Sequence, residues 1–166
     1  MPVPDAAFDA LYRAHAPSAY RRARRVLGSD ADAHEVVHDV FLSLLERPEQ
    51  FAGKSTLTTF LYSAVTHACL NRLRNQGTRA RLLREHEVEL RSGAPPVPQP
   101  DDAVLLRSAL AAMPEPLAQV AVYYYLDELS HADIARVLDC SRRHVGDLLQ
   151  RLSLWAQAQE PRPCSP

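Results

Sequence analysis

Apolar side chains recur at every third or fourth position along most of the chain, and this spacing is typical of amphipathic α-helices. The first run predicts a helix that ends at about Leu27, because Gly28 follows it. Ser29 or Asp30 can cap a second helix, which Pro48 stops. The positions expected to face inward in these two helices are Phe8, Leu11, Tyr12, His15, Ala19, Val36, Val37, Val40, Phe41, Leu44 and Leu45.

A third helix is expected after a loop at Phe51–Ser55, with Ser55 as its cap. It is predicted to continue as far as Gly77, with more helix after it. Its inward positions are Leu57, Phe60, Leu61, Ala64, Val65, Ala68, Cys69 and Leu73.

Residues 91–102 differ from the rest of the chain because they contain four prolines, a glycine and almost no large apolar side chain. Proline disfavours both helix and central strand, so we predict an extended linker between two helical modules at residues 5–90 and 103–159. The second module begins with a short helix at Ala103–Met113. A further helix begins at about Glu115, and its apolar positions are Leu117, Val120, Ala121, Tyr124 and Tyr125. Since no β-hairpin signal and no internal repeat is found, the expected fold class is all-α.

The formal charge of the chain is −1, but its basic residues are unevenly distributed. Between His67 and Arg84 there are five arginines and no acidic residue, and a second basic cluster lies near the end of the first helix. Local patches of this kind can neutralise phosphates even in a nearly neutral chain. The alternative is a solvated helix face. The clustered arginines are Arg21, Arg22, Arg24, Arg25, Arg72, Arg74, Arg79, Arg81 and Arg84.

Three cysteines, Cys69, Cys140 and Cys164, have neither metal-type spacing nor an even count. We therefore expect a reducing compartment without a disulfide framework, with Cys69 and Cys140 as small buried groups. The first residues lack a signal-peptide pattern, and no apolar run approaches the roughly 18 residues that span a membrane. These features predict a cytoplasmic protein.

The stretch Leu129–Leu152 predicts a helix-turn-helix. Ser130 caps its first helix, Ala132–Leu138, and Ser141 caps its second. Asp139 tolerates the left-handed backbone that the turn between them needs. Ala135 is expected where the helices touch, and the apolar partners are Ile134, Leu138, Cys140, Val145 and either Leu148 or Leu149. The start of such a second helix enters the major groove, so the side chains expected to face DNA are Ser141, Arg142, Arg143, His144, Gln150 and Arg151, with Asp147 also exposed.

The whole arrangement resembles the extracytoplasmic-function sigma factors, the smallest members of the sigma-70 family of RNA polymerase subunits. The similarity extends over both modules in the expected order, from about Phe8 to Trp155. The stretches that resemble family motifs are Asp32–Leu42 (DAHEVVHDVFL), Phe51–Tyr62 (FAGKSTLTTFLY), Asn71–Arg74 (NRLR), Leu110–Pro116 (LAAMPEP) and Tyr124–Ser130 (YYLDELS).

The resemblance implies a transcription initiation factor that catalyses nothing and needs no metal or cofactor. Its partners would be core RNA polymerase, promoter DNA and an anti-sigma factor. Region 2 would bind the polymerase and the −10 element, and region 4 the −35 element. The core-polymerase contacts implied are Glu35, His38, Asp39 and Leu42. The −10 contacts implied are Lys54, Ser55, Thr58, Tyr62, Asn71, Arg72 and Arg74.

Elementary chemistry supports the −10 assignment independently, because a basic groove with aromatic rings is what holds an unpaired strand. Tyr62 and Phe60, close to the arginine-rich stretch, provide both.

Several positions depart from the family pattern. Phe60 stands where Trp is usual, and His38 replaces the usual Gln. In the recognition helix, Gly146 costs about 1 kcal/mol relative to Ala. Asp147 would repel phosphates, and Leu148 replaces a common Arg. The −35 preference is therefore the least transferable implication.

Two alternatives remain. His34, Glu35 and His38 match the H-E-x-x-H zinc peptidase motif, with Glu35 as the general base, although no third-ligand motif follows. The unusual recognition helix also fits a sigma-like DNA-binding regulator, or a decoy that binds an anti-sigma protein but not promoters.

Overall fold

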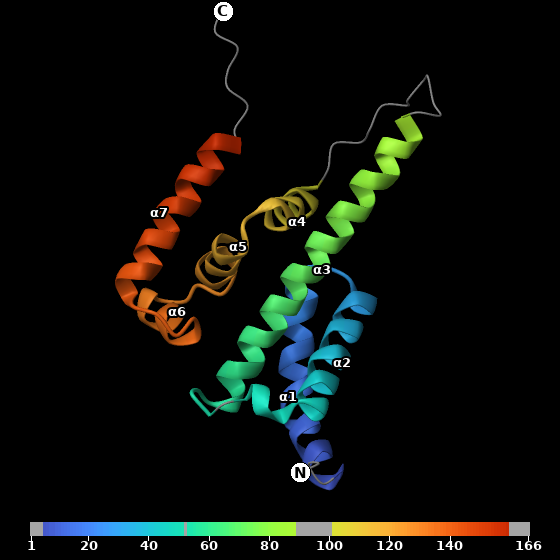
Figure 1. Cartoon of the computed structure of the whole chain (residues 1–166), viewed down its shortest axis with the longest axis vertical. Helices are drawn as coiled ribbons and strands as arrows, with labels where there is room; N and C mark the ends of the chain where they lie inside the picture. The colour runs from blue at the N-terminus through green and yellow to red at the C-terminus, as the bar shows by residue number, and fades with distance from the viewer. Residues whose placement is uncertain (1–4, 52, 89–100, 160–166) are drawn as a thin grey trace, which may run out of the picture. The chain divides into compact units, whose positions relative to one another are not determined.

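The computed structural model of the protein describes residues 5–51, 53–88 and 101–159. These residues form helices and connecting turns, without a strand among them, so the predicted all-α fold class is confirmed (Figure 1). The chain divides into two compact units, Met1–Met113 and Pro114–Pro166. Most of the linker predicted at residues 91–102 lies outside the described residues, as does Cys164.

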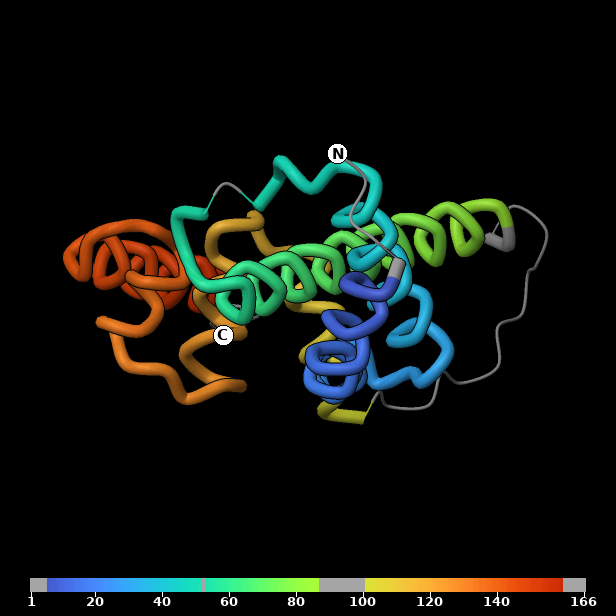
Figure 2. Tube along the Cα trace, turned by 90° about the horizontal axis from the view of Figure 1, so that it is seen from below, coloured from blue at the N-terminus to red at the C-terminus, as the bar shows by residue number. Residues whose placement is uncertain are grey.

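The first unit contains α1 (Asp5–Leu27), α2 (Asp30–Glu46), the 3-10 turn η1 (Pro48–Gln50), α3 (Leu57–Val88) and α4 (Asp102–Ala112). Helices α1 and α2 lie side by side against the N-terminal half of α3 (Figures 1 and 2). The interior of this unit is apolar, and its buried side chains include Ala23, Val26, Leu27, Ala33, Val36, Val37, Phe41, Leu61, Val65, Cys69, Leu70 and Leu73.

The junction between α1 and α2 follows the sequence prediction. Helix α1 ends at Leu27, and Gly28 adopts a left-handed backbone with φ of 72°. Ser29 is the N-cap of α2, since its hydroxyl accepts a hydrogen bond from the backbone N–H of Asp32 at 3.3 Å. Helix α2 ends before Pro48, as expected.

Two expectations about α3 are wrong. The capping residue is Thr56 rather than Ser55, because the Thr56 hydroxyl accepts from the N–H of Thr59 at 3.2 Å. The helix also continues through Gly77 without a break. Helix α4 packs against α3 there, and a Cβ on Gly77 would lie 3.4 Å from that of Ala111, so tertiary contact favours helix at a residue that usually ends one.

The second unit contains α5 (Glu115–Ala121), the π-helical turn η2 (Val122–Leu126), α6 (His131–Val137) and α7 (Arg142–Gln159). The prediction that Tyr124 and Tyr125 continue the apolar face of α5 is wrong, since they are 38% and 63% exposed. Tyr123 is fully buried instead. The cause is a π-type hydrogen bond from the N–H of Asp127 to the carbonyl of Val122 at 3.1 Å, which shifts the register.

Of the two described cysteines, Cys69 is fully buried and Cys140 is half-buried. Burial raises the pKa of the Cys69 thiol to about 12. Burial, followed by the charge of Asp139, also raises the pKa of Cys140. Both thiols are therefore held in their neutral form. None of the described helices is both long and apolar enough to cross a membrane.

Candidate nucleic-acid interface

Helices α6 and α7 form the predicted helix-turn-helix, and a serine starts each of them. The Ser130 hydroxyl accepts a hydrogen bond from the N–H of Asp133 at 3.2 Å. The Ser141 hydroxyl accepts one from the N–H of His144 at 3.1 Å. Between the helices, Asp139 adopts a left-handed backbone with φ of 51°. The predicted caps and turn are all confirmed.

Small and apolar side chains join α6 to α7. Ala135 is buried, and its carbonyl accepts a hydrogen bond from the N–H of Cys140 at 2.9 Å, which closes the turn. Val145 is fully buried, and Leu148 rather than Leu149 completes the core. Leu148 stands where the family usually has Arg. Because Leu148 is buried, this substitution alters the core contacts of α7 and leaves its exposed side unchanged.

The exposed side of α7 is polar and mostly basic along its first turns. Arginine and glutamine side chains in this position pair with base edges and phosphates. One acidic side chain, Asp147, lies among them. The exposed residues are Arg142, Arg143, His144, Asp147, Gln150 and Arg151.

The electrostatics of α6 stabilise its N-terminal cap. The Ser130 hydroxyl donates to the Asp133 carboxylate, and this bond lowers the pKa of Asp133, with Arg136 contributing less. A carboxylate in the first turn also interacts favourably with the helix dipole. The charged form of Asp133 is therefore the one that supports the start of the helix-turn-helix.

In the first unit, the beginning of α3 and the loop before it carry residues predicted to contact promoter DNA. Tyr62 is half-buried on α3. The ring of Phe60 packs edge-on against the ring of Phe51, with centroids 5.6 Å apart. The other predicted contacts here are exposed, and they are Lys54, Ser55 and Thr58.

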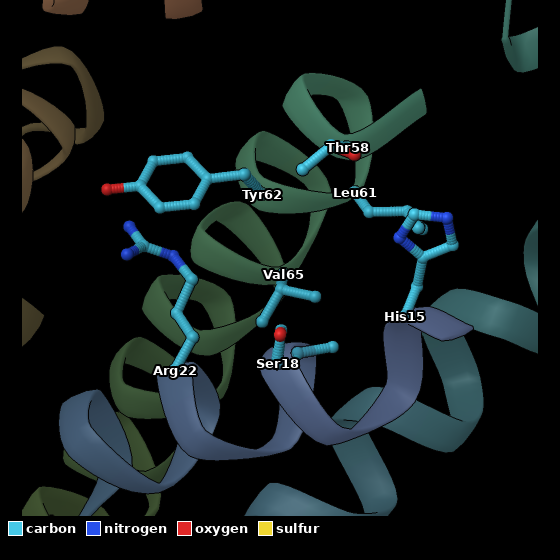
Figure 3. A pocket seen from close by; sticks show the side chains of 8 residues that line it. His15, Ser18, Arg22, Thr58, Leu61, Tyr62 and Val65 are labelled. Carbon is cyan, nitrogen blue, oxygen red and sulfur yellow. The ribbon is translucent and has the colours of Figure 1, made fainter. Parts of the chain in front are cut away.

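Tyr62 lies against a basic residue of another helix (Figure 3). The guanidinium carbon of Arg22, on α1, is 3.5 Å from the centroid of the Tyr62 ring. These two residues line one end of a pocket of about 200 Å³ between α1 and α3, and His15 lines the other end. The floor of the pocket is apolar, with Leu61 and Val65 buried there.

Sequence reasoning did not single out Arg22 for this position. It lies in a basic cluster that the sequence shows, but contact with α3 depends on packing between distant segments. Thr66 is the buried polar residue with which Arg22 forms a hydrogen bond, and no pattern in the sequence pointed to it.

The three remaining predicted DNA contacts occupy the middle of α3, and they differ in environment. Arg74 donates a hydrogen bond to the Asn71 side chain at 3.0 Å. Arg72 instead pairs with Asp32 at 3.3 Å and with Glu35, both on α2. One residue predicted to face DNA and one predicted to face the polymerase, Arg72 and Glu35, are thus in contact with each other.

Helix α2 presents the predicted polymerase contacts on one exposed face. Glu35, His38, Asp39 and Leu42 are separated by three or four residues, so they share a side of the helix, and all are exposed. Leu42 is 40% exposed, so this face of α2 includes an accessible apolar side chain.

The H-E-x-x-H motif lies on the same helix. The imidazole of His34 stacks on the ring of Tyr20, with centroids 4.4 Å apart. The Tyr20 hydroxyl in turn donates to Asp30 at 2.8 Å; this bond and Arg24 lower the pKa of Asp30. Within residues 5–51, 53–88 and 101–159, no group of three or more His, Cys, Asp or Glu side chains is placed to hold a metal ion.

Comparison with known families gives the identity of both units. The model of Sigma-70 region 2 matches residues 11–79, and the model of Sigma-70, region 4 matches residues 103–152. The chain belongs to the sigma-70 family. Region 2 covers α1, α2 and most of α3. Region 4 begins with α4, although that helix packs on α3 in the first compact unit.

The curated relatives that the chain resembles are extracytoplasmic-function (ECF) sigma factors. It is similar to the ECF RNA polymerase sigma factor SigM of Mycobacterium tuberculosis, in strains Erdman and H37Rv, with 28% identity over 132 residues. The match covers 80% of this chain and 66% of the length of SigM. A solved structure of the sigma factor RpoE in complex with the anti-sigma factor NepR, from Bartonella quintana, is similar at 15% identity with a TM-score of 0.46, over 89% of this chain and 92% of RpoE.

Proposed function

We propose that this chain is a sigma factor, which binds core RNA polymerase and directs promoter-specific transcription initiation. The observation that carries the proposal is the presence of both sigma-70 regions, in order, on one chain. The helix-turn-helix with an exposed basic face supports the DNA-binding half of the proposal.

Region 2 would act through two surfaces. The exposed face of α2 would bind the polymerase, and its apolar member Leu42 would supply the contact area that a protein interface needs. The beginning of α3 would hold the unpaired −10 strand by stacking on Tyr62 and by phosphate contacts. The residues assigned to the polymerase are Glu35, His38, Asp39 and Leu42. Those assigned to the −10 element are Lys54, Ser55, Thr58, Tyr62, Asn71, Arg72 and Arg74.

Region 4 would dock the first turns of α7 on the −35 element. Contacts to phosphates would supply most of the affinity, and contacts to base edges would supply the specificity. The residues assigned to the −35 element are Ser141, Arg142, Arg143, His144, Gln150 and Arg151.

We expect the protein to catalyse no reaction, to require no metal or cofactor and to act in the cytoplasm together with the polymerase. An anti-sigma factor is a further expected partner. Co-purification of the tagged chain from its own host, followed by identification of the bound proteins, tests both partner predictions. Recovery of the polymerase subunits is the expected result.

Reconstituted run-off transcription tests the function. Core polymerase and the purified chain are incubated with the DNA upstream of the chain's own gene. We expect a defined transcript that requires the chain. Leu42→Asp should abolish it by placing a charge in the polymerase contact, whereas Leu154→Asp, at a leucine of α7 that is even more exposed, should leave core binding intact. Stable core binding without a defined transcript would reject initiation as the function.

A second candidate is a sigma-like regulator that binds DNA without initiating transcription. Asp147 favours it, because an exposed carboxylate on the DNA-facing side of α7 repels phosphates. A regulator of this kind would protect promoter DNA in a footprint but would give no transcript with core polymerase.

A further inference from the structure

We propose that Arg22 is a positioning residue for Tyr62, which holds the tyrosine ring in the orientation that stacks on an unpaired promoter base. The inference rests on the proposed function, in which Tyr62 contacts the −10 strand. It adds to region 2 a residue of α1 that neither the sequence motifs nor the family resemblance assigns.

The first observation is the stacking of Arg22 on Tyr62. The guanidinium carbon lies 3.5 Å from the ring centroid, well inside the range of about 6 Å over which a cation and an aromatic face attract. At this distance the flat guanidinium covers one face of the ring (Figure 3). Rotation of the ring about its side-chain bonds would break the contact, so the contact restricts the ring.

The second observation is that a hydrogen bond to Thr66 holds the Arg22 side chain in place. Its Nε–H donates to the Thr66 hydroxyl at 2.8 Å, and that hydroxyl donates to the Tyr62 carbonyl at 2.8 Å. A hydroxyl has one proton and two lone pairs, so it makes both bonds at once. Thr66 is fully buried, and its position one turn after Tyr62 places it under the same stretch of α3.

Arg22, Thr66 and Tyr62 therefore form a closed chain of contacts. It runs from the ring of Tyr62 through Arg22 and Thr66 back to the backbone of Tyr62. Leu61 and Val65 are buried and give the adjoining pocket an apolar floor. A ring ordered in advance loses less conformational entropy when a base stacks on it.

These contacts require an arginine at position 22. A lysine ammonium keeps the charge but has no plane to lie on the ring, and it lacks an Nε–H in a fixed direction toward Thr66. Arg22→Lys therefore separates positioning from simple charge. The neighbouring Arg21 provides a matched control, because it is exposed and its side chain donates a hydrogen bond to Ser18 on the same helix, at 2.9 Å.

The experiment measures binding of holoenzyme to a single-stranded oligonucleotide that carries the non-template −10 sequence of a promoter mapped for this chain. 2-Aminopurine replaces each base in turn, since its fluorescence is quenched by stacking. We expect Arg22→Lys to weaken binding about fivefold and to restore fluorescence at one position. Tyr62→Leu should weaken binding about tenfold with the same fluorescence change. Arg21→Lys should match the wild type.

The double variant Arg22→Lys/Tyr62→Leu distinguishes positioning from direct contact. If Arg22 acts through the ring, the double variant binds within about twofold of Tyr62→Leu alone. Losses that multiply to about fiftyfold would instead place Arg22 on the DNA itself and overturn the inference. Wild-type binding and fluorescence in Arg22→Lys would overturn it as well.

A second pair of variants, at Thr66, distinguishes loss of positioning from a folding defect. Thr66→Val removes the hydroxyl at constant volume and should reproduce the effect of Arg22→Lys, whereas Thr66→Ser keeps both hydrogen bonds and should bind like the wild type. Thermal unfolding of the full chain monitors the fold of each variant. A wild-type holoenzyme that binds no promoter strand would overturn the proposed function together with this inference. Wild-type binding with a silent Thr66→Val would overturn the inference alone.

Discussion

Arg72 of α3 pairs with Asp32 of α2, with 3.3 Å between Nε and Oδ1. Arg72 also contacts Glu35, and Gln76 donates to Asp32 at 3.1 Å. The side chains of Arg72 and Asp32 are 30% and 26% exposed, so water screens the pair only in part. The pair joins the helix proposed to bind polymerase to the helix proposed to bind promoter DNA.

Arg72→Ala should therefore destabilise the first unit. We expect a loss of about 1–2 kcal/mol in the free energy of unfolding, because Asp32 would remain partly buried without its cation. Urea unfolding of the full chain measures this loss. Arg79→Ala, at an exposed position of the same helix, should change stability by less than about 0.5 kcal/mol. Equal effects of the two substitutions would contradict a structural role for Arg72.

Arg74 is expected to affect DNA binding more directly. Its side chain donates a hydrogen bond to Asn71 on its own helix, at 3.0 Å. If Arg74 contacts one phosphate, Arg74→Ala should lower the slope of log affinity against log salt by about 0.9. Promoter binding by holoenzyme over a range of KCl concentrations measures the slope. An unchanged slope would remove Arg74 from the DNA surface.

Features that depend on neighbouring residues were predicted well from the sequence. Ser29, Ser130 and Ser141 cap helices because a short hydroxyl side chain reaches an N–H only three residues away. The left-handed backbone of Asp139 is also a local feature, because it depends on the residue type in the turn. Glu35, His38, Asp39 and Leu42, the residues proposed to contact the polymerase, likewise share one exposed side of α2 because they are three or four residues apart.

Features that depend on contacts between distant segments were not predicted. The π-helical turn moves Tyr123 into the core in place of its neighbours, and no local pattern announces it. Helix α3 passes through Gly77 where α4 packs on it. The pairing of Arg72 with α2 and of Arg22 with Tyr62 likewise depends on how three helices pack together.

Gly146 offers a substitution that should stabilise the second unit. It lies inside α7, and a Cβ built on it meets no atom within 4 Å. Gly146→Ala should therefore raise the free energy of unfolding by about 0.5–1 kcal/mol, through lower backbone entropy in the unfolded chain. Urea unfolding gives the value, and −35 binding should not weaken. Destabilisation would mean that glycine is required here for packing that the open space does not suggest.

The cap of α6 should give a pH dependence. Because the folded-state pKa of Asp133 is lowered, its charged form stabilises the fold above its ordinary pKa of about 4, and this contribution is lost as the pH falls through the folded-state value. The stability difference between wild type and Asp133→Asn should therefore be largest at neutral pH and shrink below about pH 4. Unfolding measured from pH 7 to pH 3 tests this. A difference that stays constant with pH would contradict the cap.

The most direct test of initiation by this chain is transcription of fragmented genomic DNA from its own host by core polymerase, with and without the chain, followed by mapping of the RNA 5′ ends. We predict a set of 5′ ends that appears only with the chain and that shares one −10 sequence, with an upstream element at constant spacing. The same 5′ ends with and without the chain would contradict the proposal that it is an initiation factor.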